Sequence, residues 1–365
     1  MKLNYVSNID TIYILVDIEN YELSAKNILD YLQKEKEEAK LTAISNTSYK
    51  HIITINNLTF QLLTNGTKGY AYILHNNGYE VKISQYKSKI ESLLPIQVRI
   101  SSEYLWAFGI EKSWAIIYNW LVETFGNVEK EKVCRVDLCS HISDINLTSD
   151  WETSYKGNFK KRNMFLTNNP INAITFGSRE SKNIYCRIYN KTLELQEKKH
   201  KAWFNEIWIK NNLNVKNVWN IEFEIKSGFL RNYNFHTVND IVSHLKDIWN
   251  FCTTKFLIKI NNDNAKIERC SINSDWLEIQ KCYDNFNSLG LVEREKQQEY
   301  DANILIPSIM GNITSYCANK RILTFEEAIE NLKNDSKKYF LKKATTFEKE
   351  IKGKIIKIND SEVIE

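Results

Sequence analysis

The amino-acid sequence predicts an α+β fold, in which a largely antiparallel sheet with helices is followed by a mostly helical C-terminal extension. Short strand-like runs follow one another across hairpin turns, without the regular strand–helix alternation of a parallel sheet. From residue 238 onward, by contrast, the helical pattern dominates. With 365 residues, 43% of them apolar and 26% charged, the composition is that of a globular protein with one large or two ordinary domains.

The first half of the chain predicts two helices set between strands. Lys26–Lys40 has amphipathic helical spacing, and Ser24 stands where an N-cap belongs. Residues 106–125 carry apolar side chains on one stripe and predict the second helix. Asn65-Gly66 and Asn77-Gly78 predict hairpin turns. The predicted strands are residues 9–18, 51–55, 58–64, 69–76, 79–85 and 96–100.

The second half continues with strands and then with helices. Strands are predicted at residues 133–142, as a pair within 171–194 around Gly177-Ser178, and at 218–226. A helix is predicted at 202–211. We therefore expect a sheet-based domain at residues 1–250 and a mostly helical accessory region at residues 251–365.

The cysteines and the apolar segments exclude several classes of protein. The seven cysteines form no Cys-x-x-Cys pair, which argues against a zinc ribbon and a disulfide framework. The N-terminal residues lack the apolar core of a secretory signal, and no apolar run is long enough to span a membrane. We expect a cytoplasmic protein without a membrane partner.

Positive charge is concentrated in the middle of the chain. The net charge is only +4, but residues 155–216 hold thirteen Lys or Arg against four Glu. Such a basic block within a folded chain favours a phosphate-rich partner. The alternative is a solvated lysine surface without a ligand.

Three predicted strands carry polar side chains on one face each. Because side chains alternate along a strand, neighbouring strands would bring these residues onto one surface. Carboxylates bind a hard divalent cation, and a tyrosine oxygen attacks a phosphodiester. Solvated pairs on a half-exposed sheet are the alternative. The three sets are Arg135, Asp137, Cys139 and His141; Tyr185, Arg187, Tyr189 and Lys191; and Asn220, Glu222 and Glu224.

Other chemistries find little support in the sequence. It contains no His-x-x-His or His-x-x-x-His pair for a zinc hydrolase and no His-hydrophobe-His motif. It also lacks a Walker-type loop, so any DNA-unwinding motor must come from another protein.

The polar strands resemble the Rep-trans family of rolling-circle replication initiators of plasmids and phages, which is related to the relaxases of integrative elements. The resemblance covers roughly residues 96–257. The motifs that carry it are Arg135-Val-Asp137-Leu, Thr175-Phe-Gly177-Ser178-Arg179-Glu-Ser181, Arg187-Ile-Tyr189-Asn-Lys191-Thr-Leu-Glu194 and Trp219-Asn-Ile-Glu222-Phe-Glu224.

The resemblance implies an enzyme that nicks one DNA strand at an origin and stays joined to its 5′ phosphate through a tyrosine. Tyr189 is then the nucleophile, with Tyr185 as the alternative on the same strand face. Arg187 and Lys191 would hold the scissile phosphate.

The resemblance also implies a divalent metal ion, Mg²⁺ or Mn²⁺, held by Asp137 and Glu222 with help from Glu224. Two positions depart from the family pattern. His141 stands where a second acidic residue is common, and Asn220 stands where a basic residue often precedes the glutamate. His141 could still bind a metal, with a changed ion preference.

Several partners and two alternative functions follow from the same resemblance. The expected partners are origin DNA, single-stranded at the nick and duplex nearby, a host helicase, and a second copy in a homodimer. A conjugative relaxase would have the same chemistry. A non-catalytic DNA-binding regulator on the same scaffold is the alternative from another class.

The C-terminal segment carries a second basic surplus. Residues 320–357 hold eleven Lys or Arg against six Asp or Glu. Thr324 and Glu327 have the spacing of a capping box at the start of a helix. This helix is expected either to contact duplex DNA through its lysines or to present them to solvent.

Overall fold

The computed structural model describes residues 3–45, 50–88, 93–166, 170–198, 201–292 and 306–352. The chain divides into two compact units, residues 1–294 and residues 295–365.

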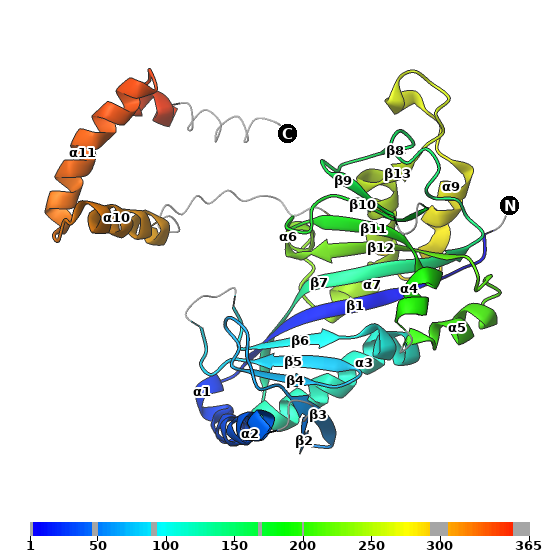
Figure 1. Ribbon diagram of the computed structural model, residues 1–365, viewed down its shortest axis with the longest axis horizontal. Helices are drawn as coiled ribbons and strands as arrows, with labels where there is room; N and C mark the ends of the chain where they lie inside the picture. Colours follow the sequence, from blue (N-terminus) through cyan, green and yellow to red (C-terminus); the bar gives the residue numbers. More distant parts are fainter. Residues whose placement is uncertain are drawn as a thin grey trace. The chain divides into compact units, whose positions relative to one another are not determined.

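The first unit is built on an eleven-stranded sheet in which all neighbouring strands run antiparallel (Figure 1). The strand order is β2-β3-β4-β5-β6-β1-β7-β12-β11-β10-β9. This sheet, together with its helices, confirms the predicted α+β class. The strands are β1 (Tyr5–Ile18), β2 (His51–Ile55), β3 (Leu58–Leu62), β4 (Tyr72–His75), β5 (Tyr79–Ile83), β6 (Ile96–Ile100), β7 (Val128–Ser143), β9 (Arg162–Leu166), β10 (Ile171–Phe176), β11 (Ile184–Asn190) and β12 (Val218–Lys226). Two short strands, β8 (Tyr155–Lys156) and β13 (Ile258–Lys259), pair separately.

Two long strands, β1 and β7, form the middle of the sheet and join its two halves. Their register shifts between Ile9 and Thr11, so that Asp10 is an extra residue opposite Asp137. A β-bulge of this kind re-aims one side chain and is frequent beside active sites.

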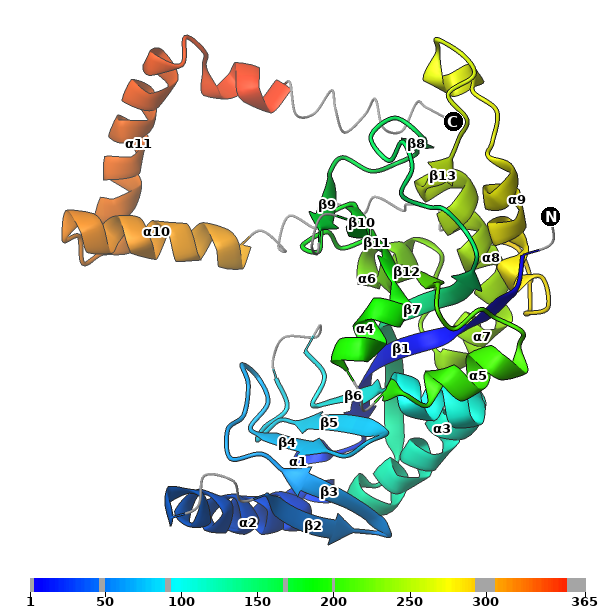
Figure 2. The same cartoon turned by 45° about the vertical axis from the view of Figure 1, so that its right-hand side comes forward.

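The two faces of the sheet differ because apolar and polar residues alternate along the strands. On one face Val136, Leu138, Ile221, Phe223 and Ile188 belong to one large buried core. Most helices of the unit pack against this core, whereas the two helices within residues 191–210 pack around a second, smaller apolar cluster on the other side of the central strands (Figure 2). The helices of the unit are α1 (Tyr21–Ser24), α2 (Lys26–Ser45), α3 (Ser102–Phe125), α4 (Lys191–Glu197), α5 (Phe204–Lys210), α6 (Ser227–Asn232), α7 (Val238–Ser243), α8 (Leu245–Phe251), a π-helix at Cys252–Phe256, and α9 (Ser274–Gln280).

The first unit extends well beyond the boundary predicted at residue 250. Trp276 and Tyr283 are fully buried in the sheet's core. The Tyr283 hydroxyl lies 2.7 Å from the backbone oxygen of Asn8 on β1 and accepts the backbone N–H of Cys139 on β7 at 3.1 Å. These large aromatic residues cover the back of the sheet, so the predicted boundary falls inside the unit rather than at its end.

The second unit contains two helices, α10 (Ile306–Lys320) and α11 (Phe325–Lys342). Thr324 caps α11, where its side chain accepts the backbone N–H of Glu327. Lys333, Lys337 and Lys342 on α11 are exposed. Among the helices that the structure describes, none is long and apolar enough to cross a membrane. Contact of these lysines with duplex DNA stays a prediction.

Candidate active site

Three neighbouring strands place the predicted site residues in rows across the open face of the sheet. Strand β12 lies between β11 and β7. In the first row Tyr189 is opposite Asn220, which is opposite His141. In the second row Glu222 lies between Arg187 and Cys139. The third row is Tyr185, Glu224 and Asp137. The alternation therefore brings the predicted residues onto one surface.

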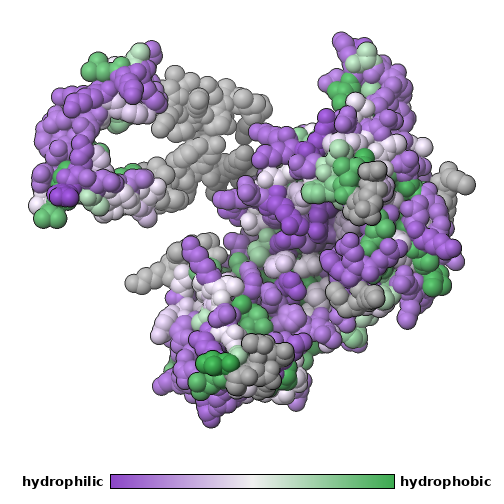
Figure 3. Space-filling view, in the orientation of Figure 1, coloured by the Kyte–Doolittle hydropathy of each residue, from purple (hydrophilic) through white to green (hydrophobic). Residues whose placement is uncertain are grey.

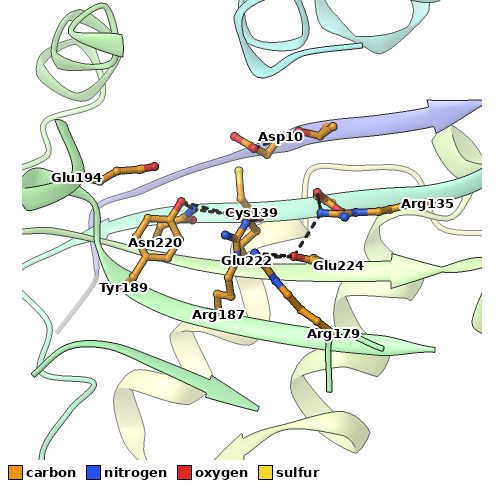
Figure 4. Close-up of polar contacts among 12 residues, drawn as sticks. Asp10, Arg135, Cys139, Arg179, Arg187, Tyr189, Glu194, Asn220, Glu222 and Glu224 are labelled. Atoms are coloured by element: carbon orange, nitrogen blue, oxygen red, sulfur yellow. Dashed lines mark hydrogen bonds and ion pairs between the residues drawn. The ribbon is translucent and has the colours of Figure 1, made fainter. Parts of the chain in front are cut away.

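The oxygen of Tyr189 has three polar partners (Figure 4). It accepts hydrogen bonds from Lys191 Nζ at 3.1 Å and from Asn220 Nδ2 at 2.9 Å, and it donates one to Glu222 Oε2 at 3.1 Å. Burial, followed by the charges of Glu222, Glu194 and Asp10, raises the pKa of Tyr189 well above its ordinary value. The phenol is therefore neutral and needs an acceptor for its proton before it can attack.

Lys191 reaches the Tyr189 oxygen because the chain changes conformation immediately after Tyr189. Strand β11 ends at Asn190, whose side chain caps α4 by accepting the backbone N–H of Leu193 at 3.0 Å. Lys191, the first residue of the helix, is 1% exposed, and its ammonium lies 5.0 Å from the ring centroid of Phe204. Its charge is balanced by Glu194 at 2.6 Å.

The Lys191–Glu194 ion pair makes a testable contribution to stability. Burial alone would raise the pKa of Glu194, but the charge of Lys191 and hydrogen bonds from Lys191 and Lys198 lower it from 4.5 to about 2. A carboxylate with a lowered folded-state pKa stabilises the protein above its unfolded pKa and loses that contribution as the pH falls toward 2. We expect Glu194→Gln to reduce the free energy of unfolding by about 3 kcal/mol at pH 7 and by almost nothing near pH 2.

Urea unfolding of both proteins at the two pH values measures this difference. Glu197→Gln, an exposed position on the same helix, is the matched control and should leave the stability unchanged. Equal stability of Glu194→Gln and the unsubstituted protein at pH 7 would show that the pair contributes nothing.

The three carboxylates on the open face are engaged by guanidinium groups. Arg135 binds Asp137 through two hydrogen bonds, at 2.7 and 2.6 Å. Arg187 donates to Glu222. Glu224, 1% exposed, lies 3.3 Å from Arg135 and 3.7 Å from Arg187. Paired in this way, buried carboxylates do not carry unbalanced charge.

This pairing bears on the predicted divalent metal ion. Within the described ranges no three His, Cys, Asp or Glu side chains converge as a metal shell. The oxygens of Asp137 and Glu222 already accept hydrogen bonds from Arg135 and Arg187, so a cation would have to displace these guanidinium groups. As arranged, the residues do not fit a metal ion.

His141 lies in an aromatic cluster on the side of Asn220. Its Nδ1 accepts the indole N–H of Trp208 at 2.9 Å, and its ring stacks on Trp106 at a centroid distance of 5.0 Å. Burial and the nearby charge of Lys191 lower the pKa of His141 well below its ordinary value. A neutral imidazole that accepts at Nδ1 carries its proton on Nε2, so neither nitrogen presents a lone pair to a metal ion in this arrangement. This geometry does not fit the ligand role predicted for His141.

Tyr185 lies in a different environment from Tyr189. It is 7% exposed, and the guanidinium of Arg179 and the ammonium of Lys226 lie 5.7 and 5.9 Å from its ring centroid. Its cross-strand partner is Glu224, which the same two cations approach within 4 Å. The hydroxyl of Tyr189, in contrast, donates directly to a carboxylate.

Asp10 belongs to this centre, although the sequence pattern does not single it out. The β1 bulge places it on the β1 side of Cys139 (Figure 4). Burial, followed by the charge of Glu222, raises the pKa of Asp10, while Lys191 lowers it. The one available signal is the break in alternation after Ile9, where the next core residue is Ile12.

The cationic side of the centre opens into a pocket of about 460 Å³. Tyr189, Arg187, Arg179, Lys198 and Phe165 are among the residues that line it. Figure 3 shows hydrophilic residues gathered over this part of the sheet. Cations and an aromatic ring beside a nucleophilic oxygen suit an unpaired nucleic-acid strand.

Comparison with solved structures finds a structural likeness. No family model matches the chain, and no curated protein matches it in sequence. A rolling circle replication initiator protein from Geobacillus stearothermophilus is similar in structure, with a TM-score of 0.45 and 12% sequence identity. The similarity covers 79% of this chain and 100% of that chain. At this distance the similarity carries no argument about function.

Proposed function

We propose that the protein is a rolling-circle DNA replication initiator that nicks and rejoins one strand through a covalent tyrosyl-DNA intermediate. The observation that carries the proposal is the environment of the Tyr189 oxygen. It is held by Lys191, Asn220 and Glu222 at the edge of a pocket that also contains Arg187.

The hydrogen bonds of Tyr189 support one acceptor for its proton. An ammonium and an amide N–H can only donate, so Lys191 and Asn220 cannot take the phenol proton. Glu222 is the acceptor in this set, and it already receives the hydrogen bond from Tyr189 at 3.1 Å. Glu222 therefore acts as the general base when Tyr189 attacks.

The cations stabilise the negative charge that develops during attack. The Tyr189 oxygen forms a bond to phosphorus, and the bond from phosphorus to the leaving sugar oxygen breaks. The phenol proton passes to Glu222 and the leaving oxygen takes a proton from water, which leaves a 5′ phosphotyrosine and a free 3′ hydroxyl. Lys191 contacts the attacking oxygen, and Arg187 lines the pocket where the phosphate oxygens would lie. Attack by the free hydroxyl on the phosphotyrosine reverses the step and rejoins the strand.

The remaining partners are proposals that follow from this function. Origin DNA is the substrate, a host helicase supplies unwinding, and a second copy and the lysines of α11 are further candidates for duplex contact. A relaxase would use the same chemistry on a transfer origin. A non-catalytic regulator is favoured by no observation in the site.

Covalent capture tests the proposal without knowledge of the origin. The full chain is incubated with a random-sequence single-stranded DNA library and Mg²⁺ or Mn²⁺, then denatured and washed, and the linked DNA and peptide are sequenced. We expect DNA joined at Tyr189. A protein that retains no DNA after denaturation would be the regulator instead.

A further inference from the structure

A second pocket, of about 310 Å³, borders the same centre from the side of β1 and β6. It is lined by residues of β1, the β4–β5 turn, β6, the start of α3 and the segment before α5. Its lining includes Asp10, Arg99, Lys201 and Trp203. Its volume is at the lower end of the range for small-ligand sites.

Asp10 connects this pocket to Tyr189. Its carboxylate lines the pocket, and its charge acts on both Tyr189 and Lys191. The β1 bulge is what turns Asp10 toward this position. A strand whose phosphate lies at Tyr189 would thus pass directly beside the pocket.

The pocket holds an unpaired donor and an unpaired acceptor. In the part of the chain that the structure describes, Arg99 Nε and Asp10 Oδ1 are both buried without a hydrogen-bond partner. Buried polar atoms are nearly always paired, so each of these two calls for a partner. A ligand that both accepts and donates would satisfy them together.

An aromatic ring and a cation complete the lining. Trp203 is half-buried and stacks on Phe204 with 3.9 Å between ring centroids. Phe204 in turn lies under the ammonium of Lys191, which ties this wall to the catalytic centre. Lys201 adds positive charge, and Glu103 adds a second carboxylate beside Asp10. A lining of mixed charge with an aromatic wall suits a neutral, flat, hydrogen-bonding group better than a bare phosphate.

We propose that this pocket receives one unpaired nucleobase next to the scissile phosphate, so that Arg99 and Asp10 select the sequence at which the strand is cut. The inference rests on the proposed nicking function and adds the DNA sequence that this function selects. Guanine is the expected base, because O6 and N7 accept from a guanidinium while its N–H groups donate to a carboxylate. Enzymes that act on single strands read extruded bases in this way, through edge hydrogen bonds and stacking.

The experiment compares the sequences captured covalently from the random single-stranded library by different variants. The unsubstituted protein should favour guanine at one position near the joined phosphate. Arg99→Gln should reduce the preference at that position about tenfold while the preferences at other positions persist. Asp10→Asn, which replaces an acceptor by an amide, should change the preferred base there. Lys130→Gln, an exposed position near the start of β7, is the matched control and should leave the profile unchanged.

The possible outcomes distinguish a failure of the base-reading pocket from a failure of the proposed nicking function. Unchanged sequence profiles in both Arg99→Gln and Asp10→Asn would overturn the base-reading pocket while leaving nicking intact. If Arg99→Gln instead loses a preference for a base other than guanine, the assignment of Arg99 as donor and Asp10 as acceptor to guanine would be wrong. Should Arg99→Gln fail to fold, Arg99→Lys and Trp203→Leu test the same pocket. No captured DNA from the unsubstituted protein would refute the nicking function itself.

Discussion

Tyr189→Phe is expected to abolish the covalent DNA adduct. The substitution removes the attacking oxygen and keeps the aromatic ring, so it should abolish the reaction without changing the packing of the site. Arg187, Arg179 and Lys198 still line the pocket, so affinity for a single-stranded oligonucleotide should change by no more than a few fold. Adduct formation is read on a denaturing gel, and affinity by fluorescence anisotropy with the same oligonucleotide.

Tyr185→Phe is the matched control, because Tyr185 lies on the same face of β11 four residues away. It should form the adduct at close to the rate of the unsubstituted protein. An adduct that persists in Tyr189→Phe and disappears in Tyr185→Phe would transfer the nucleophile role to Tyr185.

The rows of polar residues could be predicted from the sequence because they depend only on alternation. Arg187, Glu222 and Cys139 alternate with apolar residues on three strands, and the sheet order makes these strands neighbours. Segments whose apolar residues alternate, such as residues 218–226, are strands in the structure, and segments with helical spacing, such as residues 106–125, are helices. Alternation alone decides which face each side chain occupies.

Other features depend on contacts between distant segments and could not be predicted in this way. His141 lies on the predicted face, but Trp106 of α3 stacks on its ring and Trp208 of α5 donates to its Nδ1. Asp10 enters the site through a bulge. The domain boundary failed because Tyr283 returns to the sheet and contacts the backbone of both central strands.

Lys191 shows a mixture of the two cases. Its place in the motif suggested a residue on the same strand face as Tyr189. In the structure it is the first residue of α4, and the Asn190 cap turns it back over the phenol. Motif spacing identified Lys191, but the position of its ammonium depends on the change from strand to helix at Asn190.

Glu222→Gln is expected to slow adduct formation by about 10²- to 10⁴-fold near neutral pH, because the amide cannot accept the phenol proton as a carboxylate does. The residual rate should rise with pH as hydroxide takes over this role, since burial, the largest cause of the raised pKa of Tyr189, remains after the charge of Glu222 is removed. Single-turnover rates over a pH series measure both effects. A Gln variant that reacts at the original rate would remove Glu222 from the proton transfer.

The same assay with a chelator separates a proton acceptor from a metal ligand. Asp137 lies opposite Glu224 and is bound by Arg135, and Tyr189 is hydrogen-bonded to Glu222 instead. If Glu222 acts as the base, Asp137→Asn should react far faster than Glu222→Gln, and added Mg²⁺ or Mn²⁺ should not rescue the Gln variant. If the two carboxylates share a metal ion, both variants and the EDTA-treated protein should lose activity together, and excess Mn²⁺ should restore part of it. Full activity in EDTA would contradict the metal prediction, whereas joint loss would require Arg135 and Arg187 to release their carboxylates when the ion binds.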